Sequence, residues 1–222
     1  MRKKIRLLAL TLIWLVLLFS AAGRLDWARG WIFVALWVVG MGCTAAAVKR
    51  ANPDLLEARA KWRRADTKPF DKVFLAIFVP LSTIQPAIGA LDAARFGWSE
   101  TPDWWLWLGI ALFIPGVALM AWSMVANRHA ETTVRIQSDR GHTVVTRGPY
   151  RFVRHPMYVG AITMYVASAL ILGSVWALAL AGVIAMLFVW RTALEDRTLR
   201  RELAGYEEFS QHTRYRLLPG VW

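Results

Sequence analysis

Residues that bind metals or form disulfides are scarce in this sequence. Its 222 residues include one cysteine, Cys43, and four histidines. A single cysteine excludes an intramolecular disulfide, and because it lies in an apolar run it gives no information on the redox compartment. The histidines and the cysteine show no ligand spacing such as H-x-x-x-H or C-x-x-C, so we predict no metal site.

Acidic residues are also few. Asp and Glu number 15 against 27 Lys and Arg, which gives a formal net charge of +12. Such basicity can indicate a nucleic-acid partner, but the sequence is 57% hydrophobic and contains 13 Trp. Soluble domains are closer to about 45–50% apolar. The composition therefore indicates a membrane protein.

Six apolar runs predict an all-α, polytopic integral membrane protein. Four runs approach the ~20 residues that a bilayer-spanning helix needs, and two are shorter. The shorter two meet at Gly173-Ser174, which predicts a tight helical hairpin. Apart from Arg6 at the very start, the runs contain no acidic or basic residue, whereas an ion-coupled transporter normally has one near the midplane. The predicted spans are Ile5–Ala22, Trp31–Val48, Val73–Leu91, Trp104–Ala126, Met157–Leu172 and Val175–Trp190.

The positive charges orient these spans. Only Arg24, Arg29 and Arg95 lie in the turns on one side. The other Lys and Arg lie in residues 1–6, 49–72, 127–155 and 191–222. Because cytoplasmic segments carry the excess of Lys and Arg, we predict a bacterial-type inner (plasma) membrane protein with both termini in the cytoplasm. This placement explains the basicity without a nucleic-acid partner.

The N-terminus also has features of a secretory signal. MRKKIRLLALTLIWLVLLFSAAG combines basic residues, an apolar stretch and small residues. Cleavage after it would leave an odd number of helices and remove part of the charge asymmetry. We therefore expect this segment to be retained as the first span.

Two regions follow from this pattern: membrane helices in residues 1–126, with a basic loop at 49–72, and a polar-rich region at 127–222. Within the basic loop, Asn52 can cap a helix with Pro53 in its first turn. Trp62 between basic residues is typical of a helix that lies against anionic headgroups. A basic retention loop and a role in gating substrate access fit the sequence equally well.

Polar residues are dense from Asn127 onward, next to two predicted spans. The stretch RGPYRFVRHPMYVG, residues 147–160, carries three arginines, a histidine and two tyrosines where the chain should enter lipid. An arginine at the centre of a lipid-facing helix costs about 2.5–3.5 kcal/mol, so such groups persist where they line a wet cavity or meet a polar partner. Arginines favour a carboxylate or phosphate partner. Anchoring at the membrane surface explains Arg147 and Arg151 equally well, whereas Arg154-His155 favours a site.

An acidic pair, Glu195-Asp196, follows the last predicted span by about one turn. It lies in a segment that is otherwise rich in arginine. The pair can form ion pairs with Arg191 or Arg200, or it can accept hydrogen bonds from the hydroxyl or amino groups of a cofactor.

These motifs resemble one family. HTVVTRGPYRFVRHPMYVG resembles the core motif of the isoprenylcysteine carboxyl methyltransferases, H-T-x-V-T-x-G-x-Y followed by R-H-P-x-Y-x-G. The tail EDRTL…GYEEF…RYRLLP resembles the closing pattern of that family, although Asp196 stands where the family often has Glu. The resemblance covers roughly residues 127–219. Phospholipid N-methyltransferases are similar more loosely, in the P-M-Y-x-G element and the acidic pair.

The resemblance implies an integral-membrane methyltransferase that uses S-adenosyl-L-methionine. The loop before the helical hairpin at 157–190, the hairpin itself and the tail would form a cofactor pocket open to the cytoplasm. Arg154, His155 and Glu195 would be catalytic. The implied cofactor-binding residues are His142, Gly148, Tyr150, His155, Pro156, Tyr158, Gly160, Glu195, Asp196, Tyr206, Arg214 and Pro219. A lipidic or amphiphilic acceptor would arrive from the membrane near Asn127, Arg128, His129 and Arg151.

The acceptor determines which groups the reaction needs. A carboxylate, as in O-methylation of a lipidic or prenylated cysteine-like acceptor, is already ionised and needs only alignment and removal of water. An amine must lose a proton, and His129, His142 or His155 is then the candidate base.

Other functions stay open on sequence alone. The alternatives are a phospholipid N-methyltransferase and an NADPH-dependent membrane reductase of the sterol reductase type, which resembles this chain in R-H-P-x-Y-x-G and in YRLLPG. A non-catalytic membrane protein is less favoured.

Overall fold

The computed structural model describes residue 12, residues 14–61 and residues 64–222. Within this part the chain is helical and contains no β-strand. Residues 14–22 are helical, and the N-terminal part of the first predicted span lies outside the described residues. The long helices are α2 (Ala28–Ala51), α4 (Pro69–Ala90), α5 (Trp104–Ala126), α6 (Pro156–Leu172) and α7 (Val175–Glu202). The short ones are α3 (Pro53–Ala60), α8 (Tyr206–His212), a π-helix (Leu91–Phe96) and 3-10 turns at Ser138–Arg140 and Gly148–Arg151.

Four of the described helices are long and apolar enough to cross a membrane. They are Ala28–Ala51, Pro69–Phe96, Trp104–Ala126 and Val175–Glu202. The fifth predicted span corresponds to α6, which has 17 residues and is about 26 Å long at 1.5 Å per residue. That is slightly less than the ~30 Å hydrocarbon core. The last predicted span, Val175–Trp190, is the apolar part of α7, and the helix itself continues to Glu202.

The extension of α7 has a simple cause. Residues 191–202 are rich in Arg, Leu and Glu, which are strong helix formers although they are not apolar. The helix therefore leaves the apolar layer without stopping and carries the acidic pair beyond it. At its other end, α7 begins directly after Gly173-Ser174, the predicted turn of the hairpin.

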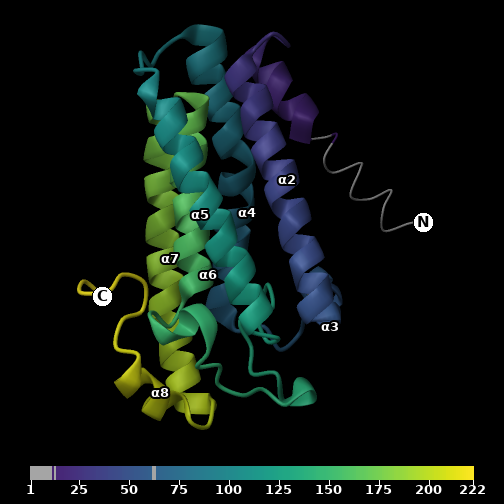
Figure 1. Ribbon diagram of the computed structural model, residues 1–222, viewed down its shortest axis with the longest axis vertical. Helices are drawn as coiled ribbons and strands as arrows, with labels where there is room; N and C mark the ends of the chain where they lie inside the picture. The colour runs from purple at the N-terminus through teal and green to yellow at the C-terminus, as the bar shows by residue number, and fades with distance from the viewer. Residues whose placement is uncertain (1–11, 13, 62–63) are drawn as a thin grey trace.

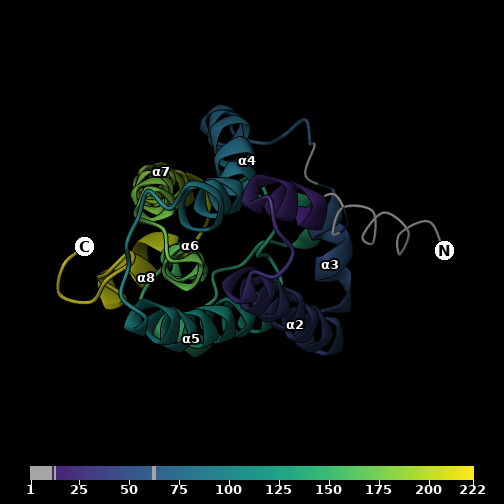
Figure 2. The same ribbon diagram turned by 90° about the horizontal axis from the view of Figure 1, so that it is seen from above.

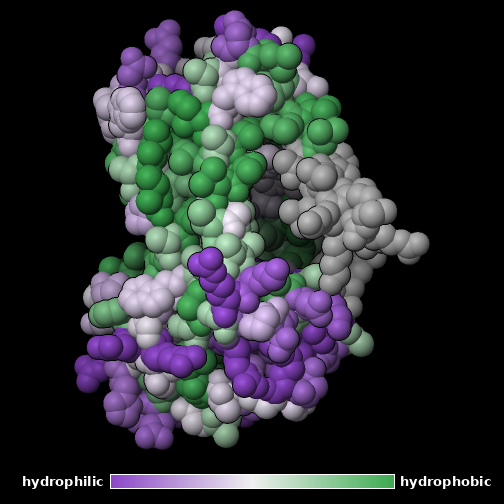
Figure 3. Space-filling model, turned by 45° about the vertical axis from the view of Figure 1, so that its right-hand side comes forward, coloured by the Kyte–Doolittle hydropathy of each residue, from purple (hydrophilic) through white to green (hydrophobic). Residues whose placement is uncertain are grey.

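The helices form an upright bundle around α6. It packs against α5, α7, α2 and α4, as seen along the bundle in Figure 2. The helix α3, the loop 127–155, α8 and the C-terminal tail gather at one end of the bundle (Figure 1). Hydrophilic residues concentrate at this end, below a broad hydrophobic band (Figure 3). The segments with most of the polar motifs are thus brought together in space.

Glycines let α5 and α6 approach closely. A Cβ on Gly160 of α6 would lie 2.7 Å from the carbonyl oxygen of Gly116 and 3.0 Å from the backbone nitrogen of Met120. Gly109, further along α5, meets the backbone of α6 in the same way. Small residues at such contacts are typical of packed membrane helices. The close contact with α5 accounts for Gly160 without a cofactor.

A buried carboxylate holds the opposite end of the bundle. Asp92, in the π-helix, accepts hydrogen bonds from the hydroxyls of Ser99, at 2.6 Å, and Ser174. Ser174 in turn caps α7 by accepting from the backbone N–H of Ala177 at 2.9 Å. The start of α7 is therefore fixed relative to α4, and this fixes the height of the acidic pair at the other end.

The contact between α5 and α6 gives a first prediction. Gly160→Ala should lower the free energy of unfolding by about 1–3 kcal/mol, because the methyl group meets backbone atoms that cannot move aside. Gly182→Ala is the matched control, since a Cβ there meets nothing within 4 Å. It should leave stability unchanged or raise it by about 1 kcal/mol through helix propensity. Thermal unfolding of the two variants in detergent tests this, and equal stability of both would contradict it.

Candidate active site

A polar cavity lies at the hydrophilic end of the bundle. Four parts of the chain line it: the loop 127–155, the start of α6, the end of α7 and α8. It encloses about 750 Å³ of space between the side chains, including its open mouth. Its polar lining includes Asn127, His129, Glu131, Arg135, Gln137, His142, Tyr150, Arg154, His155, Tyr158, Arg191, Glu195 and Tyr206.

Asp196 is the centre of a buried ion cluster behind one wall. Its carboxylate is fully buried and binds Arg154 through two contacts, of 2.7 Å and 3.3 Å. Arg216 of the tail donates to Oδ2 of the same carboxylate at 3.0 Å. Tyr206 of α8 donates its hydroxyl at 3.1 Å. Asp196 therefore joins the loop, α7, α8 and the tail, and it does not itself line the cavity.

Arg154 ties the tail to the loop in a second way. Its Nη1 donates to the carbonyl oxygens of Thr213 and Arg214, each at 2.8 Å. Its backbone N–H donates to the carbonyl of Tyr215 at 2.9 Å, and the next N–H, of His155, donates to Arg216 at 3.0 Å. The guanidinium of Arg154 is thus engaged by protein groups on all sides, which suits a structural role.

Glu195, next to Asp196, turns toward the cavity. It is half-buried and accepts a hydrogen bond from the hydroxyl of Tyr158 on α6. Arg191, one turn earlier on α7, forms an ion pair with Asp71 of α4 at 2.9 Å. It also donates to the carbonyl of Thr132 at 2.9 Å, which holds the loop over the cavity. Asp196 does not line the cavity, and Arg191 is paired with Asp71. Glu195 is therefore the acidic side chain that α7 presents to the cavity.

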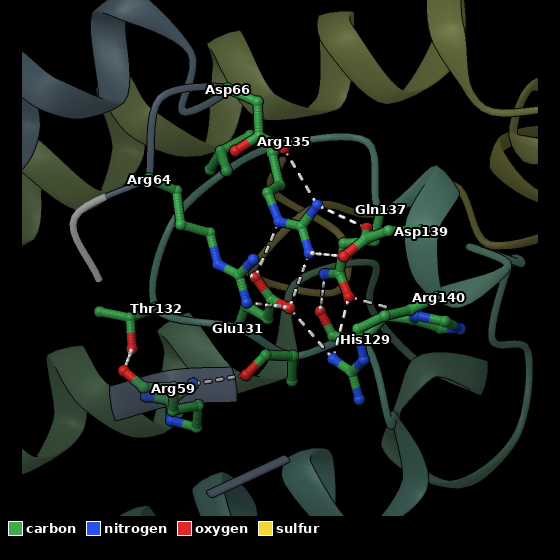
Figure 4. A network of polar contacts seen from close by, with 12 residues as sticks. Arg59, Arg64, Asp66, His129, Glu131, Thr132, Arg135, Gln137, Asp139 and Arg140 are labelled. Atoms are coloured by element: carbon green, nitrogen blue, oxygen red, sulfur yellow. Dashed lines mark hydrogen bonds and ion pairs between the residues drawn. The ribbon is translucent and has the colours of Figure 1, made fainter. Parts of the chain in front are cut away.

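The loop that forms the opposite wall is held by ion pairs, drawn in Figure 4. Arg135 binds Glu131 through two contacts, of 2.9 Å and 3.0 Å, and binds Asp139 at 2.7 Å. Arg140 contacts Glu131 at 3.1 Å. Arg64, in the segment before α4, contacts Glu131 at 3.4 Å. Burial raises the pKa of Glu131, but the hydrogen bonds and charge of Arg135 outweigh it, so the pKa lies below its usual 4.5.

Two histidines of this wall face the cavity side by side. The ring centroids of His129 and His142 are 4.7 Å apart. The side-chain amide of Gln137 donates to the backbone carbonyl oxygen of His129 at 2.7 Å and so holds this residue in place. Burial lowers the pKa of both imidazoles, that of His142 to about 4, so both rings are neutral at pH 7. The buried Nε2 of His129 has no hydrogen-bond partner among the described residues, so it is available to a ligand.

Aromatic side chains complete the lining. Burial raises the pKa of Tyr150 to about 12, and its hydroxyl accepts from the side chain of Asn127 at 3.2 Å. Burial, together with the charge of Asp196, raises the pKa of Tyr206 as well. Both phenols therefore stay protonated near neutral pH and can donate hydrogen bonds.

The predicted site residues fall into two groups in the structure. Those that line the cavity are Asn127, His129, His142, Tyr150, Arg154, His155, Tyr158, Glu195 and Tyr206. Those outside its lining are Arg128, Gly148, Arg151, Pro156, Gly160, Asp196, Arg214 and Pro219.

The residues outside the lining have other surroundings. Gly148 has φ +64°, and a Cβ there would lie 3.0 Å from that of Ala126, so the turn requires glycine. Pro156 occupies the first turn of α6, where proline is well tolerated. Arg128, Arg151, Arg214 and Pro219 are exposed.

Several residues of the site were not predicted from the sequence. Glu131, Arg135 and Gln137 were not singled out, because they lie in a loop without helical structure, where an i, i+4 spacing does not indicate contact. Asp71 was also missed, because nothing in the sequence indicates that it meets Arg191 across more than a hundred residues.

Comparison with known proteins indicates the same class of protein as the sequence motifs. Residues 104–204 match the family model described as phospholipid methyltransferase. The protein-S-isoprenylcysteine O-methyltransferase B of Arabidopsis thaliana is 29% identical over 112 residues, which is 49% of this chain. The chain spans 57% of the length of that relative. The resemblance to membrane methyltransferases that the motifs indicated is therefore confirmed.

The two adjacent acids should respond differently to neutralisation. Asp196→Asn should lower the free energy of unfolding by about 3–5 kcal/mol, because it leaves the buried Arg154 without its counter-charge. Glu195→Gln should cost far less, since its carboxylate is half-buried and faces the cavity. Thermal unfolding, with proteolysis of the tail as a second readout, measures both. Greater loss of stability in Glu195→Gln would contradict the assignment.

The histidine pair predicts a pH dependence of stability. The unfolded ring of His142 takes up a proton near pH 6.5, but the folded ring does so only near pH 4, so protons favour the unfolded chain between these values. Stability should be complete above pH 6.5 and fall as the pH decreases toward 4.5. His142→Gln should flatten this dependence, as measured by melting temperature. Arg135 lowers the pKa of Glu131, which moves the titration of that carboxylate away from this range. An unchanged slope in the variant would contradict the prediction.

Proposed function

We propose that this protein is an integral-membrane methyltransferase that uses S-adenosyl-L-methionine and modifies a lipidic acceptor by carboxyl O-methylation. The observation that carries the proposal is the cavity in which the R-H-P-x-Y motif and the acidic residue of α7 meet, with Tyr158 hydrogen-bonded to Glu195. The similarity to membrane methyltransferases supports the same chemistry.

The residues of the cavity suit this cofactor. The carboxylate of Glu195 can accept hydrogen bonds from ribose hydroxyls or balance a sulfonium charge. The rings of Tyr150 and Tyr206 offer π-faces to a cation. The unpartnered Nε2 of His129 is an additional polar contact. When bound, the cofactor supplies an activated methyl group.

The protein contributes alignment and removal of water. Arg154 and His155 hold the tail against the loop and close one side of the cavity. Opposite charges disappear as a methyl group moves from a sulfonium to a carboxylate, so a site that excludes water favours the transfer. A carboxylate acceptor needs no base, and the reaction then depends on orientation.

The lowered pKa values of two candidate bases fit this acceptor better than an amine. The low pKa of His142, about 4, makes it a poor base for an ammonium group of pKa ~10. His129 is shifted in the same direction. N-methylation of a phospholipid is the second candidate, because the matching family model is described as phospholipid methyltransferase.

The position of the site supports a membrane-derived acceptor. The cavity lies where α6 and α7 meet the polar end of the bundle. We infer that the protein has six spans with both termini in the cytoplasm of an inner membrane, and that the cavity faces the cytoplasm. The basic segments at this end support that orientation. Residues 1–126 and 127–222 would then be the membrane anchor and the methyltransferase core.

Transfer of a radiolabelled methyl group from S-adenosylmethionine into a membrane extract tests the function. Purified protein should label a lipid-extractable product, and the label should be released by mild base because it is an ester. A base-stable label would contradict carboxyl O-methylation and would indicate N-methylation instead. The absence of any label would contradict methyl transfer.

Glu195→Gln should weaken binding of S-adenosylhomocysteine about tenfold or more, through loss of a charged hydrogen-bond acceptor. Glu208→Gln is the matched control, because Glu208 is exposed on α8 outside the cavity. His155→Ala should weaken binding as well. Calorimetry of the purified proteins measures the affinities, and wild-type affinity in both site variants would refute the site assignment.

A further inference from the structure

A second groove runs along the outer face of α4, away from the cavity described above. Its helical wall is made by residues spaced i, i+3, i+4, i+7 and i+8, which lie on one helix face. These residues are Lys72, Leu75, Ala76, Val79 and Pro80. The other wall is made by Arg64, Ala65 and Thr67, in the segment that precedes the helix.

The helical part of the groove is apolar and lies in a candidate span. Val79 is 47% exposed, and Leu75 is half-buried. Eight residues of helix extend about 12 Å, so this face continues from the polar end of the bundle into the apolar layer. A hydrocarbon chain fits such a surface, because it is the environment that an exposed span meets in the bilayer.

The polar end of the groove offers unmatched donors. Lys72 is exposed and has no ion-pair partner among the described residues, unlike Lys68, whose Nζ lies 2.7 Å from Glu202. Thr67 is only 5% exposed, yet its buried hydroxyl has no partner in the same part of the chain. A buried hydroxyl without a partner costs free energy unless a ligand satisfies it.

The neighbouring ion cluster does not neutralise Lys72. Three arginines of this cluster face three carboxylates, so their formal charges balance. They are Arg64, Arg135 and Arg140, against Glu131, Asp66 and Asp139. The charge of Lys72, near the start of the candidate span Pro69–Phe96, is therefore an excess positive charge.

We propose that this groove binds an anionic phospholipid. The headgroup phosphate is held by Lys72, with Thr67 and Arg64 beside it, and an acyl chain lies along Leu75 and Val79. The site is separate from the cavity and does not depend on the proposed function. The proposal also assigns a specific ligand to the basic segment before α4. This segment carries more charge than a simple connection between helices needs.

Binding of phosphatidylglycerol to the full chain, purified in detergent and analysed by native mass spectrometry, tests the proposal. Phosphatidylglycerol should bind more tightly than phosphatidylcholine of the same chain length. Lys72→Gln should weaken it about fivefold, the contribution of one basic residue near an anionic headgroup. Lys61→Gln is the matched control, because Lys61 is exposed at the end of α3 and does not line the groove.

Two further variants separate binding from folding. Thr67→Val should weaken binding without lowering thermal stability, because the hydroxyl has no partner within the described chain. Val79→Trp should block the chain without changing any charge. Equal binding of the two lipids, or equal effects of Lys72→Gln and Lys61→Gln, would overturn the proposal. Equal binding of soluble glycerol phosphate would also overturn it, because the apolar face would then contribute nothing.

Discussion

The buried carboxylate of Asp196 determines how the polar end of the protein is assembled. It contacts Arg154, Tyr206 and Arg216, which come from three segments that are separate in the sequence. Taking an ion out of water costs several kcal/mol, and close charged partners compensate only when the geometry is good. The two contacts with Arg154 meet that condition because a guanidinium presents a planar pair of donors. The positions of the loop 127–155, of α7 and of the C-terminal tail therefore depend on one another.

A second buried ion cluster holds the loop that forms the other wall of the cavity. Arg135 and Glu131 are both buried, and each has more than one partner of opposite charge. This cluster gives a loop with little regular structure a defined shape, which in turn orients the histidines. The two ion clusters thus stabilise a polar cavity outside the apolar layer, where hydrophobic packing alone could not.

The sequence predicted the helical class and the turn at Gly173-Ser174. It could do so because apolar runs and local motifs depend on neighbouring residues. Contacts between residues far apart in the sequence were not predicted. Asp71 contacts Arg191, and Gly160 contacts α5, and no local pattern in the sequence indicates either contact. The predicted span Val175–Trp190 is shorter than α7, because the span was predicted from apolarity and the helix continues through residues that are not apolar.

The acidic pair illustrates why position in a motif does not determine role. Adjacent residues on a helix point about 100° apart, so Glu195 and Asp196 cannot face the same surroundings. The first reaches Tyr158 at the cavity, and the second is enclosed by arginines. The shorter Asp suits the enclosed position, because Arg154 and Arg216 themselves extend to the surface of α7. A Glu there would carry its charge beyond these partners, so the residue that departs from the family pattern is the one that the local packing requires.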